Sequence, residues 1–469
     1  MSENIEKKTA HLEEEKPLLE LPALIKVLIS FFALCLGASF LFLPWQIVLF
    51  LFLGMVLGIV VFLNLYIGIL VFLAGAFFHP TYWFTSLQEL HPARYLALGI
   101  LFIWGFHIII YRDFKLVKTP QNILMIAFFS LAFLTMLNSY FDFSVTYFIE
   151  IASKALVLYF VIANLVKTRR EAIFLIWFLV VISYISALAG IYQYVHHVGV
   201  YYEKEGILRI TGFSEDPNFF AMDLVVTLPL AIGLFFYYRH FLVKVLSALI
   251  VLCLIAATIL TFSRAGLIQL LSVLLFSVGI RILKKRKLLA IASFLLAVVI
   301  FIPLIPQKYW ERIQTIANFS DPAIVMRLDC WKTGLAMIAD HPIAGVGFGQ
   351  FRIGFLEKSM AVAGGSDVVG TTFKGFLDAQ NLFIQTCAEL GLIGFALFLG
   401  IILLTLKYLR ESVRAFYKKE DFLLMEISLA LQISFIVYLL GGFFNSYLQL
   451  LIFWIIVPFA VALRKLAYE

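Results

Sequence analysis

Long apolar segments recur along almost the whole chain, separated by short connectors that carry charged residues or proline. Each segment is about 17 to 25 residues long, which is the length an α-helix needs to cross the hydrocarbon core of a bilayer. Helix is expected because a segment that spans lipid must satisfy its backbone hydrogen bonds internally. The pattern therefore predicts an all-α, polytopic integral membrane protein with about 12–14 transmembrane helices.

The predicted spans run from near the N-terminus to near the C-terminus. They are 24–43, 45–62, 64–80, 93–111, 121–138, 144–165, 171–193, 217–237, 241–262, 264–281, 287–304, 383–406, 424–442 and 446–463. The breaks at Pro44-Trp45 and Asn64 are weak. A re-entrant or tilted helix in that part of the chain would lower the number of spans.

Basic residues cluster in short connectors, at 167–170, 284–287 and 418–419, as they do in the cytoplasmic loops of membrane proteins. With these connectors inside, the number of crossings is consistent and both termini are cytoplasmic. Two longer connectors, near 196–216 and 306–380, then lie outside. The predicted parts are a cytoplasmic tail (1–22), an N-terminal transmembrane bundle (23–304), a large outer loop with surface helices (305–382) and C-terminal transmembrane helices (383–469).

Composition supports a membrane protein rather than a soluble one. Hydrophobic residues make up 63% of the chain and charged residues 14%, whereas a soluble domain is about half apolar. The net charge of +7 follows from the basic connectors, so membrane lipids are expected partners and nucleic acid is not. The cysteines, Cys35, Cys253, Cys330 and Cys387, lack the spacing of metal ligands, and no metal site or disulfide framework is predicted.

The outer connectors carry arginine where topology disfavours positive charge. These residues are Arg209, Arg312, Arg327 and Arg352, and they suggest an anion-binding surface. A surface helix is predicted to begin at Pro322, which follows the capping pair Ser-Asp. Apolar residues then recur at helical spacing, at Ile324, Leu328, Trp331, Leu335 and Ile338.

This surface helix is predicted to end near Asp340, because Pro342 disfavours helix in the residue before it. If helix persisted to His341, that residue would lie about four turns beyond Arg327 and on the same face.

The segment Thr261-Phe262-Ser263-Arg264-Ala265-Gly266 places an arginine at the outer junction of two spans. An arginine near a helix end often extends only to the lipid headgroups. The functional alternative is a guanidinium that binds a phosphate or diphosphate through two hydrogen bonds.

The entry into the span at 217–237 reads Glu215-Asp216-Pro217-Asn218. Asp and Asn around a proline are ordinary helix-start residues. In the functional interpretation, Asp216 or Asn218 binds a sugar or an acceptor.

The large outer loop reads Arg327-Leu-Asp-Cys-Trp and later His341-Pro-x-x-Gly345-x-Gly347-x-Gly349. Two further motifs follow, Asp378-Ala-Gln-Asn381 and Glu389-Leu-Gly-Leu-Ile-Gly394. The glycines permit tight turns and close backbone approach. Nucleotide-binding motifs and metal-spaced clusters do not occur, so no cofactor is predicted.

This ordered series of motifs, over roughly residues 211–395, resembles the O-antigen ligase and polymerase superfamily of bacterial envelopes. The pattern is Asp-Pro-Asn-x-x-Ala, Thr-x-Ser-Arg-x-Gly, Arg-x-x-x-Trp with His-Pro-x-x-Gly-x-Gly, and Asn-x-x-x-Gln with Glu-x-Gly-x-x-Gly. The resemblance implies a metal-independent glycosyltransferase of the bacterial inner membrane. It implies transfer of a glycan from an undecaprenyl-diphosphate carrier to the hydroxyl of a carbohydrate or lipid-linked acceptor at the periplasmic face, where the large loop would lie.

The resemblance also implies residue roles. Arg264 and Arg327 match two essential arginines that hold the diphosphate as its charge grows. Family ligases carry a base histidine where this chain has Gln380, and glutamine cannot accept the proton. That difference slightly favours a polymerase.

The expected substrate-binding residues are Asp216, Asn218, Ser263, His341, Gly345, Gly347, Asn381 and Glu389.

The general base therefore has three candidates, Asp378, Glu389 and His341, and Asp378 is preferred because it lies two residues from Gln380. Together with the arginines, Asp378 and Gln380 are the expected catalytic residues.

The alternative function is a transporter or flippase of lipid-linked sugars. Glu150 and Lys154 lie four residues apart in one span and are expected to neutralise each other. Asp223 is a further ionisable residue inside a span. The two halves show no sequence repeat of the kind many transporters have, which favours the enzyme.

Overall fold

The protein is described here by a computed structural model that covers residues 45–77, 92–111, 116–136, 141–202, 207–214, 216–283, 307–314, 322–355, 378–446 and 450–469, with Ser30 and Leu448. The chain forms two units, Met1–Asn64 and Leu65–Glu469. Helix α3 (Trp45–Leu63) belongs to the first unit. All other elements below belong to the second.

The second unit is almost entirely helical in its described residues. Its helices are α4 (Leu65–Phe77), α5 (Pro92–Tyr111), α6 (Pro120–Met136), α7 (Phe141–Leu165), α8 (Arg169–Val195), α9 (Pro217–Tyr237), α10 (Phe241–Leu260), α11 (Arg264–Leu283), α13 (Gln307–Gln314), α14 (Pro322–Asp340), α17 (Leu382–Lys418), α18 (Phe422–Gly441) and α19 (Leu451–Tyr468). Strands β1 (Val200–Tyr202) and β2 (Ile207–Arg209) form one antiparallel hairpin, with Val200 paired to Arg209.

Among the described helices, seven are long and apolar enough to cross a membrane: α7 from Ser144, α8, α9, α10, α17, α18 and α19. Three shorter apolar helices, Leu65–Phe77, Pro120–Met136 and Arg264–Ser277, accompany them. The predicted class, an all-α polytopic membrane protein, is confirmed. The predicted spans 24–43 and 287–304 lie outside the described residues.

Two predicted boundaries differ clearly from the structure. Helix α17 continues to Lys418 rather than ending near residue 406, because its last turns are charged and the apolar pattern no longer marks them. Helix α19 begins at Leu451 rather than at 446, after an irregular turn in which the Trp454 indole donates to the carbonyl of Leu448 at 2.8 Å. The helix predicted from Pro322 to near Asp340 is confirmed as α14, with those bounds.

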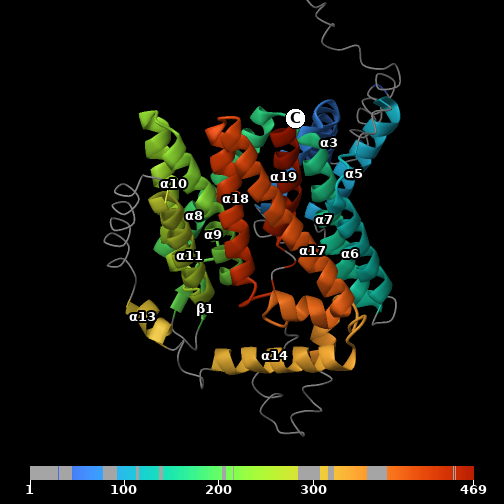
Figure 1. Ribbon diagram of the computed structural model, residues 1–469, viewed down its shortest axis with the longest axis vertical. Helices are drawn as coiled ribbons and strands as arrows, with labels where there is room; N and C mark the ends of the chain where they lie inside the picture. The colour runs from blue at the N-terminus through green and yellow to red at the C-terminus, as the bar shows by residue number, and fades with distance from the viewer. Residues whose placement is uncertain are drawn as a thin grey trace, which may run out of the picture. The chain divides into compact units, whose positions relative to one another are not determined.

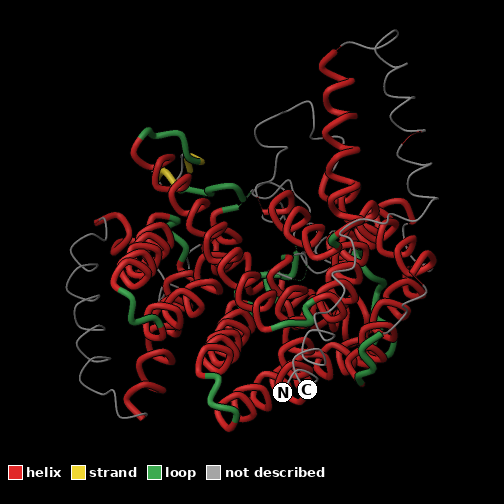
Figure 2. The backbone as a smooth tube through the Cα atoms, turned by 90° about the horizontal axis from the view of Figure 1, so that it is seen from above, coloured by secondary structure: helices red, strands yellow, loops and turns green. Residues whose placement is uncertain are grey.

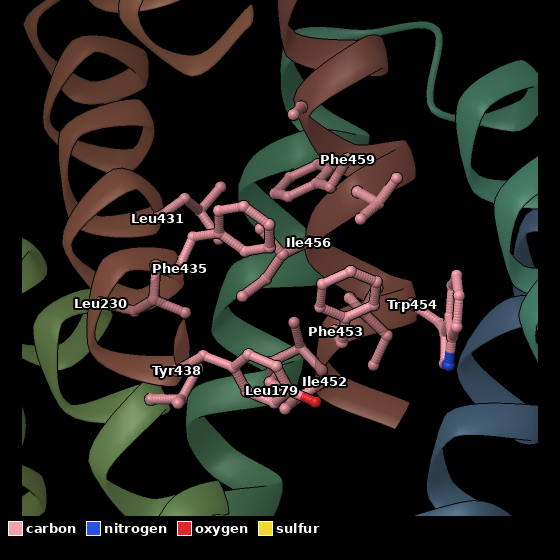
Figure 3. Packing of buried hydrophobic residues seen from close by; sticks show 14 of the residues in the cluster. Leu179, Leu230, Leu431, Phe435, Tyr438, Ile452, Phe453, Trp454, Ile456 and Phe459 are labelled. Carbon is pink, nitrogen blue, oxygen red and sulfur yellow. The ribbon is translucent and has the colours of Figure 1, made fainter. Parts of the chain in front are cut away.

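The core lies where α8, α9, α18 and α19 meet (Figure 3). Phe435 and Tyr438 of α18 stack against Phe453 of α19, with ring centroids 5.6 and 5.4 Å apart. Leu230 of α9 lies beside them. These helices are apolar around their whole circumference, as expected for helices buried among others in a membrane bundle.

Buried polar side chains join helices that are far apart in sequence. Gln121 of α6 donates to the carbonyl of Ile401 at 3.2 Å, and Ser434 of α18 donates to the carbonyl of Val226 at 2.6 Å. Such bonds contribute about 0.6 kcal/mol each between membrane helices. They fix which faces of the apolar helices meet.

One end of the second unit carries most of the non-spanning structure. Helix α14 lies across this end, and α13 and the β-hairpin lie at the same end (Figure 1). The C-terminus lies at the opposite end (Figure 1). Seen along the bundle, the two strands lie at its edge (Figure 2). The predicted site residues lie on α14 and in the turns after it, at the corner between α10 and α11, and at or near the starts of α9 and α17.

Candidate active site

The corner between α10 and α11 is held by a buried arginine. Arg209 at the end of β2 is only 3% exposed. Its Nε donates to the carbonyl of Thr261 at 2.7 Å, and its Nη2 donates to Oδ1 of Asn218 at 3.0 Å. The Ser263 hydroxyl donates to the same oxygen at 2.8 Å. Asn218 and Ser263 therefore belong to one cluster that fixes the position of Arg264, the first residue of α11.

A second contact to this corner comes from α13. Phe262 adopts a left-handed backbone, with φ 52°, which is costly for a bulky residue. The Tyr309 ring packs edge-on against Phe262 at 5.3 Å, and the Tyr309 hydroxyl donates to the carbonyl of Ser263 at 2.9 Å. Burial raises the pKa of Tyr309 above its usual range, so it donates as a neutral hydroxyl. Helix α13 thus stabilises the backbone that presents Arg264.

The glycine-rich loop after α14 docks on an irregular point of α17. The amides of Val346 and Gly347 donate to the carbonyls of Ala388 and Glu389 at 2.9 and 3.0 Å. Gly391 interrupts the helix with φ 66° and ψ −171°. Two motifs that lie about forty residues apart in sequence therefore form one structural joint.

The Glu389 carboxylate is the buried centre of this joint and is 2% exposed. It accepts hydrogen bonds from the amides of Gly349 at 3.0 Å and Phe351 at 3.3 Å, and from the Gln385 side chain at 3.1 Å. The neighbouring Gln350 side chain donates to the hydroxyl of Ser144 on α7. Glu389 thus anchors the loop, and the loop in turn contacts α7.

The start of α17 carries the other predicted residues of this region. Asn381 caps the helix by accepting from the amides of Phe383 and Ile384 at 3.0 and 3.1 Å, and its amide donates to the carbonyl of Phe443 at 3.3 Å. Asp216 caps α9 in the same way. Gln380 has a left-handed backbone with φ 52°.

Asp378 forms a two-fold ion pair with Arg352. The Nε and Nη2 atoms of Arg352 donate to the two carboxylate oxygens at 2.8 and 2.7 Å. These hydrogen bonds raise the pKa of Arg352, so its guanidinium stays charged. Because both oxygens of Asp378 accept from Arg352, this carboxylate has a positioning task at the site whether or not it also acts as a base.

A cavity of about 390 Å³, lined by both polar and apolar side chains, lies within the second unit beside this ion pair. Its walls come from α4, α7, α8, the first turns of α9, the start of α19 and Arg352. Glu150 and Lys154 of α7 form an ion pair of 3.0 Å, as predicted, and both line the cavity. Asp223 of α9 lines it as well. The cavity volume is within the ~300–1,000 Å³ typical of small-molecule sites.

Of the arginines expected to bind an anion, Arg352 lines this cavity, whereas Arg264 and Arg327 are linked to it only through neighbouring residues. On one side, the first turn of α9 contains Asn218, which belongs to the cluster behind Arg264, and Phe219, which lines the cavity. On the other side, Arg327 lies on α14, and Asp378 holds Arg352 in the cavity wall.

The Cys330 thiol is influenced by the charges of both Arg327 and Asp378. Burial raises the pKa of the Cys330 thiol to about 12, the charges of Asp329 and Asp378 add to this, and the charge of Arg327 opposes it. Arg327 and the Asp378 carboxylate therefore act on the same buried thiol. His341, by contrast, is exposed just beyond the end of α14.

Several residues of the site were not identified from sequence. Arg209 and Arg352 were expected only as part of an anion-binding surface, and Tyr309 carried no sequence signal. The cavity could have been found from a polar stripe on α7. Thr146, Glu150 and Lys154 recur at intervals of four residues and therefore share one face of that helix, but only Glu150 and Lys154 were singled out from the sequence.

The Arg352–Asp378 pair gives a testable prediction. Asp378→Ala and Arg352→Ala are each expected to lower the melting temperature and the activity to a similar extent, because each leaves one charge without its partner. The double variant is expected to lose less than the sum, with a coupling of about 0.5–3 kcal/mol. Thermal unfolding in detergent measures it. If Asp378→Ala harmed activity far more than Arg352→Ala, Asp378 would have a chemical role of its own.

The fold and site together define a multi-pass membrane protein with a charged cavity at one end of its bundle. Residues 224–399 match the O-antigen ligase family. This match confirms the resemblance of this part of the chain to the O-antigen ligase and polymerase superfamily. No curated protein matches the sequence significantly.

The matched stretch supplies only part of the site. It contains Arg264, Arg327, Arg352, Asp378 and Glu389. It begins at Leu224, after α7, α8 and the first turns of α9, which form most of the cavity wall.

Proposed function

We propose that this protein is a metal-independent glycosyltransferase of the bacterial inner membrane. In this proposal it moves a glycan from an undecaprenyl-diphosphate carrier to the hydroxyl of a carbohydrate or lipid-linked acceptor. The α14 end is the periplasmic face, and both termini are cytoplasmic. The observation that supports the proposal is a cavity with charged and hydroxyl side chains in its wall, Arg352 among them, beside the first turn of α9, where Asn218 bonds to Ser263 just before Arg264.

The reaction requires positive charge where the diphosphate leaves. As the bond between the sugar and the diphosphate breaks, negative charge grows on the phosphate oxygens. Guanidinium groups held in place before the reaction stabilise that charge without reorganising. Arg264 and Arg327 are assigned to this task, and Arg352, which lines the cavity, is assigned to the sugar. Gln380 in place of a histidine slightly favours a polymerase over a ligase.

Purified protein in lipid nanodiscs, incubated with a carrier-diphosphate glycan, provides the test. We expect release of carrier diphosphate together with a lengthened or transferred glycan, detected by mass spectrometry. The alternative, a transporter of lipid-linked sugars, is supported by the ionisable residues Glu150, Lys154 and Asp223. A transporter would carry the glycan across a vesicle membrane without releasing carrier diphosphate, and that result would contradict the proposal.

A further inference from the structure

We infer that the cavity between α7, α8 and α9 binds the acceptor sugar, and that Asp223 takes the proton from the attacking hydroxyl. This inference rests on the proposed function and deepens it. It gives the reaction a base in a chain that has glutamine at the position where a histidine was expected.

The carboxylates around the site differ in what already engages them. Asp378 is held on both oxygens by Arg352. Glu389 accepts two backbone amides and a glutamine side chain. Glu150 is paired with Lys154. Asp223 is half-buried and lines the cavity, and its carboxylate makes no hydrogen bond or ion pair with any residue that the structure describes.

The cavity wall has the chemistry that a sugar requires. Hydroxyl groups of Thr146, Ser183, Ser186 and Ser214 and the carboxylates of Glu150 and Asp223 supply hydrogen-bonding atoms for sugar hydroxyls. Aromatic rings of Phe77, Tyr147 and Phe219 supply flat apolar surface for the faces of a sugar ring. The volume of about 390 Å³ suits one or two sugar rings rather than a whole glycan.

The place of Asp223 along α9 suits proton transfer next to the diphosphate. It lies five residues beyond Asn218, which corresponds to about 7.5 Å along the helix axis. Asn218 is bonded to Ser263, immediately before Arg264. In the proposed arrangement the diphosphate stays at the arginine end of α9, while the acceptor hydroxyl reaches Asp223 from the cavity, on another face of the helix.

In the proposed glycosyl transfer, the acceptor oxygen forms a bond to the anomeric carbon of the donor sugar, and its proton passes to a carboxylate oxygen of Asp223. The bond between that carbon and the diphosphate oxygen breaks, and its electron pair stays on the carrier diphosphate. Asp223 then returns the proton to water or to the diphosphate.

Asp223→Asn is the first variant of the test, because it is isosteric and cannot accept the proton. We expect kcat for release of carrier diphosphate to fall about 10²–10⁴-fold, with the protein still inserted and its melting temperature little changed. Asp223→Glu is expected to recover part of the rate. Glu426→Gln is the matched control, since it changes a half-buried carboxylate of α18 that does not line the cavity; its rate is expected to stay at the wild-type level.

Thr146→Trp is the second variant, and it fills the cavity instead of changing the base. Carrier-free oligosaccharide, released from the carrier-linked glycan by mild acid, is the probe, and saturation-transfer NMR is the measurement. We expect binding to the wild type, unchanged binding to Glu426→Gln, and loss of binding in Thr146→Trp.

The outcomes separate this inference from the proposed function. A wild type that binds the oligosaccharide but releases no carrier diphosphate would contradict the transferase while leaving a sugar site. An active wild type with a normal rate in Asp223→Asn would show that another group takes the proton. Unchanged oligosaccharide binding in Thr146→Trp would overturn the cavity as the acceptor site.

Discussion

Arg264→Ala and Arg327→Ala are each expected to reduce glycan transfer by about 10²–10³-fold or more, the loss typical of removing one donor to a developing oxyanion. Each guanidinium offers a planar fork of hydrogen-bond donors that matches phosphate oxygens. Arg264 is placed by the Arg209 cluster and by Tyr309. Because that positioning does not depend on the Arg264 side chain, the variant should still fold.

The measurement is the initial rate of carrier-diphosphate release by purified variants, with thermal unfolding as the check on folding. Arg264→Lys and Arg327→Lys are expected to retain part of the rate, since lysine keeps the charge but binds as a single point. Arg410→Ala, at an exposed position near the other end of α17, serves as the control and should behave as the wild type. A wild-type rate of transfer in both alanine variants would show that Arg264 and Arg327 do not stabilise the leaving diphosphate.

The fold was largely predictable because its strongest determinant is local. A run of apolar residues long enough to cross lipid is visible in sequence, and lipid leaves helix as the structure such a run adopts. The ends of α17 and α19 were less predictable. In α17 the helix continues with charged residues up to Lys418, and in α19 the contact between Trp454 and Leu448 delays the start.

The candidate site was predictable only in part, because its partners are distant in sequence. The motifs drew attention to Asn218, Ser263 and Glu389, each of which belongs to a hydrogen-bonded cluster. Spacing alone does not reveal that Arg209 bonds to Thr261, fifty-two residues away. Nor does it reveal which carboxylates are already engaged. That depends on tertiary contacts such as the one between Asp378 and Arg352.

In the proposed reaction, the site has two parts with different tasks. The matched stretch supplies the arginines that are assigned to the diphosphate, which every carrier-linked donor shares. The cavity wall comes mainly from α7, α8 and the start of α9, before that stretch. In the proposed reaction these helices would determine which acceptor is used, while residues 224–399 determine how the donor is held.

The joint between the glycine-rich loop and α17 gives the largest expected effect on folding. A Cβ atom added at Gly345 would lie 2.4 Å from the backbone carbon and oxygen of Glu389, and Gly345 has a φ of +71°. A Cβ atom at Gly391 would lie 2.1 Å from the carbonyl oxygen of Ile343, with φ +66°. Both residues therefore need glycine for the same reason, the close approach of two backbones.

Gly345→Ala and Gly391→Ala are expected to destabilise the protein severely. The left-handed backbone costs about 1–2 kcal/mol for alanine, and overpacking adds about 1–3 kcal/mol. The clash is with backbone atoms, so no side-chain movement relieves it. Moving the loop would also withdraw the amide of Gly349 from the buried Glu389 carboxyl group, and a buried polar group that loses a hydrogen bond is costly.

Thermal unfolding in detergent and the amount of protein in the membrane fraction test this expectation. Gly105→Ala in α5 is the matched control, because a Cβ atom there has no atom within 4 Å and alanine favours helix by about 0.5–1 kcal/mol over glycine. It should be neutral or slightly stabilising. If the melting temperatures of Gly345→Ala and Gly391→Ala were the same as that of the control, the loop would not be docked on α17. Phe351, Arg352 and the cavity wall would then lack the support that the Glu389 joint provides.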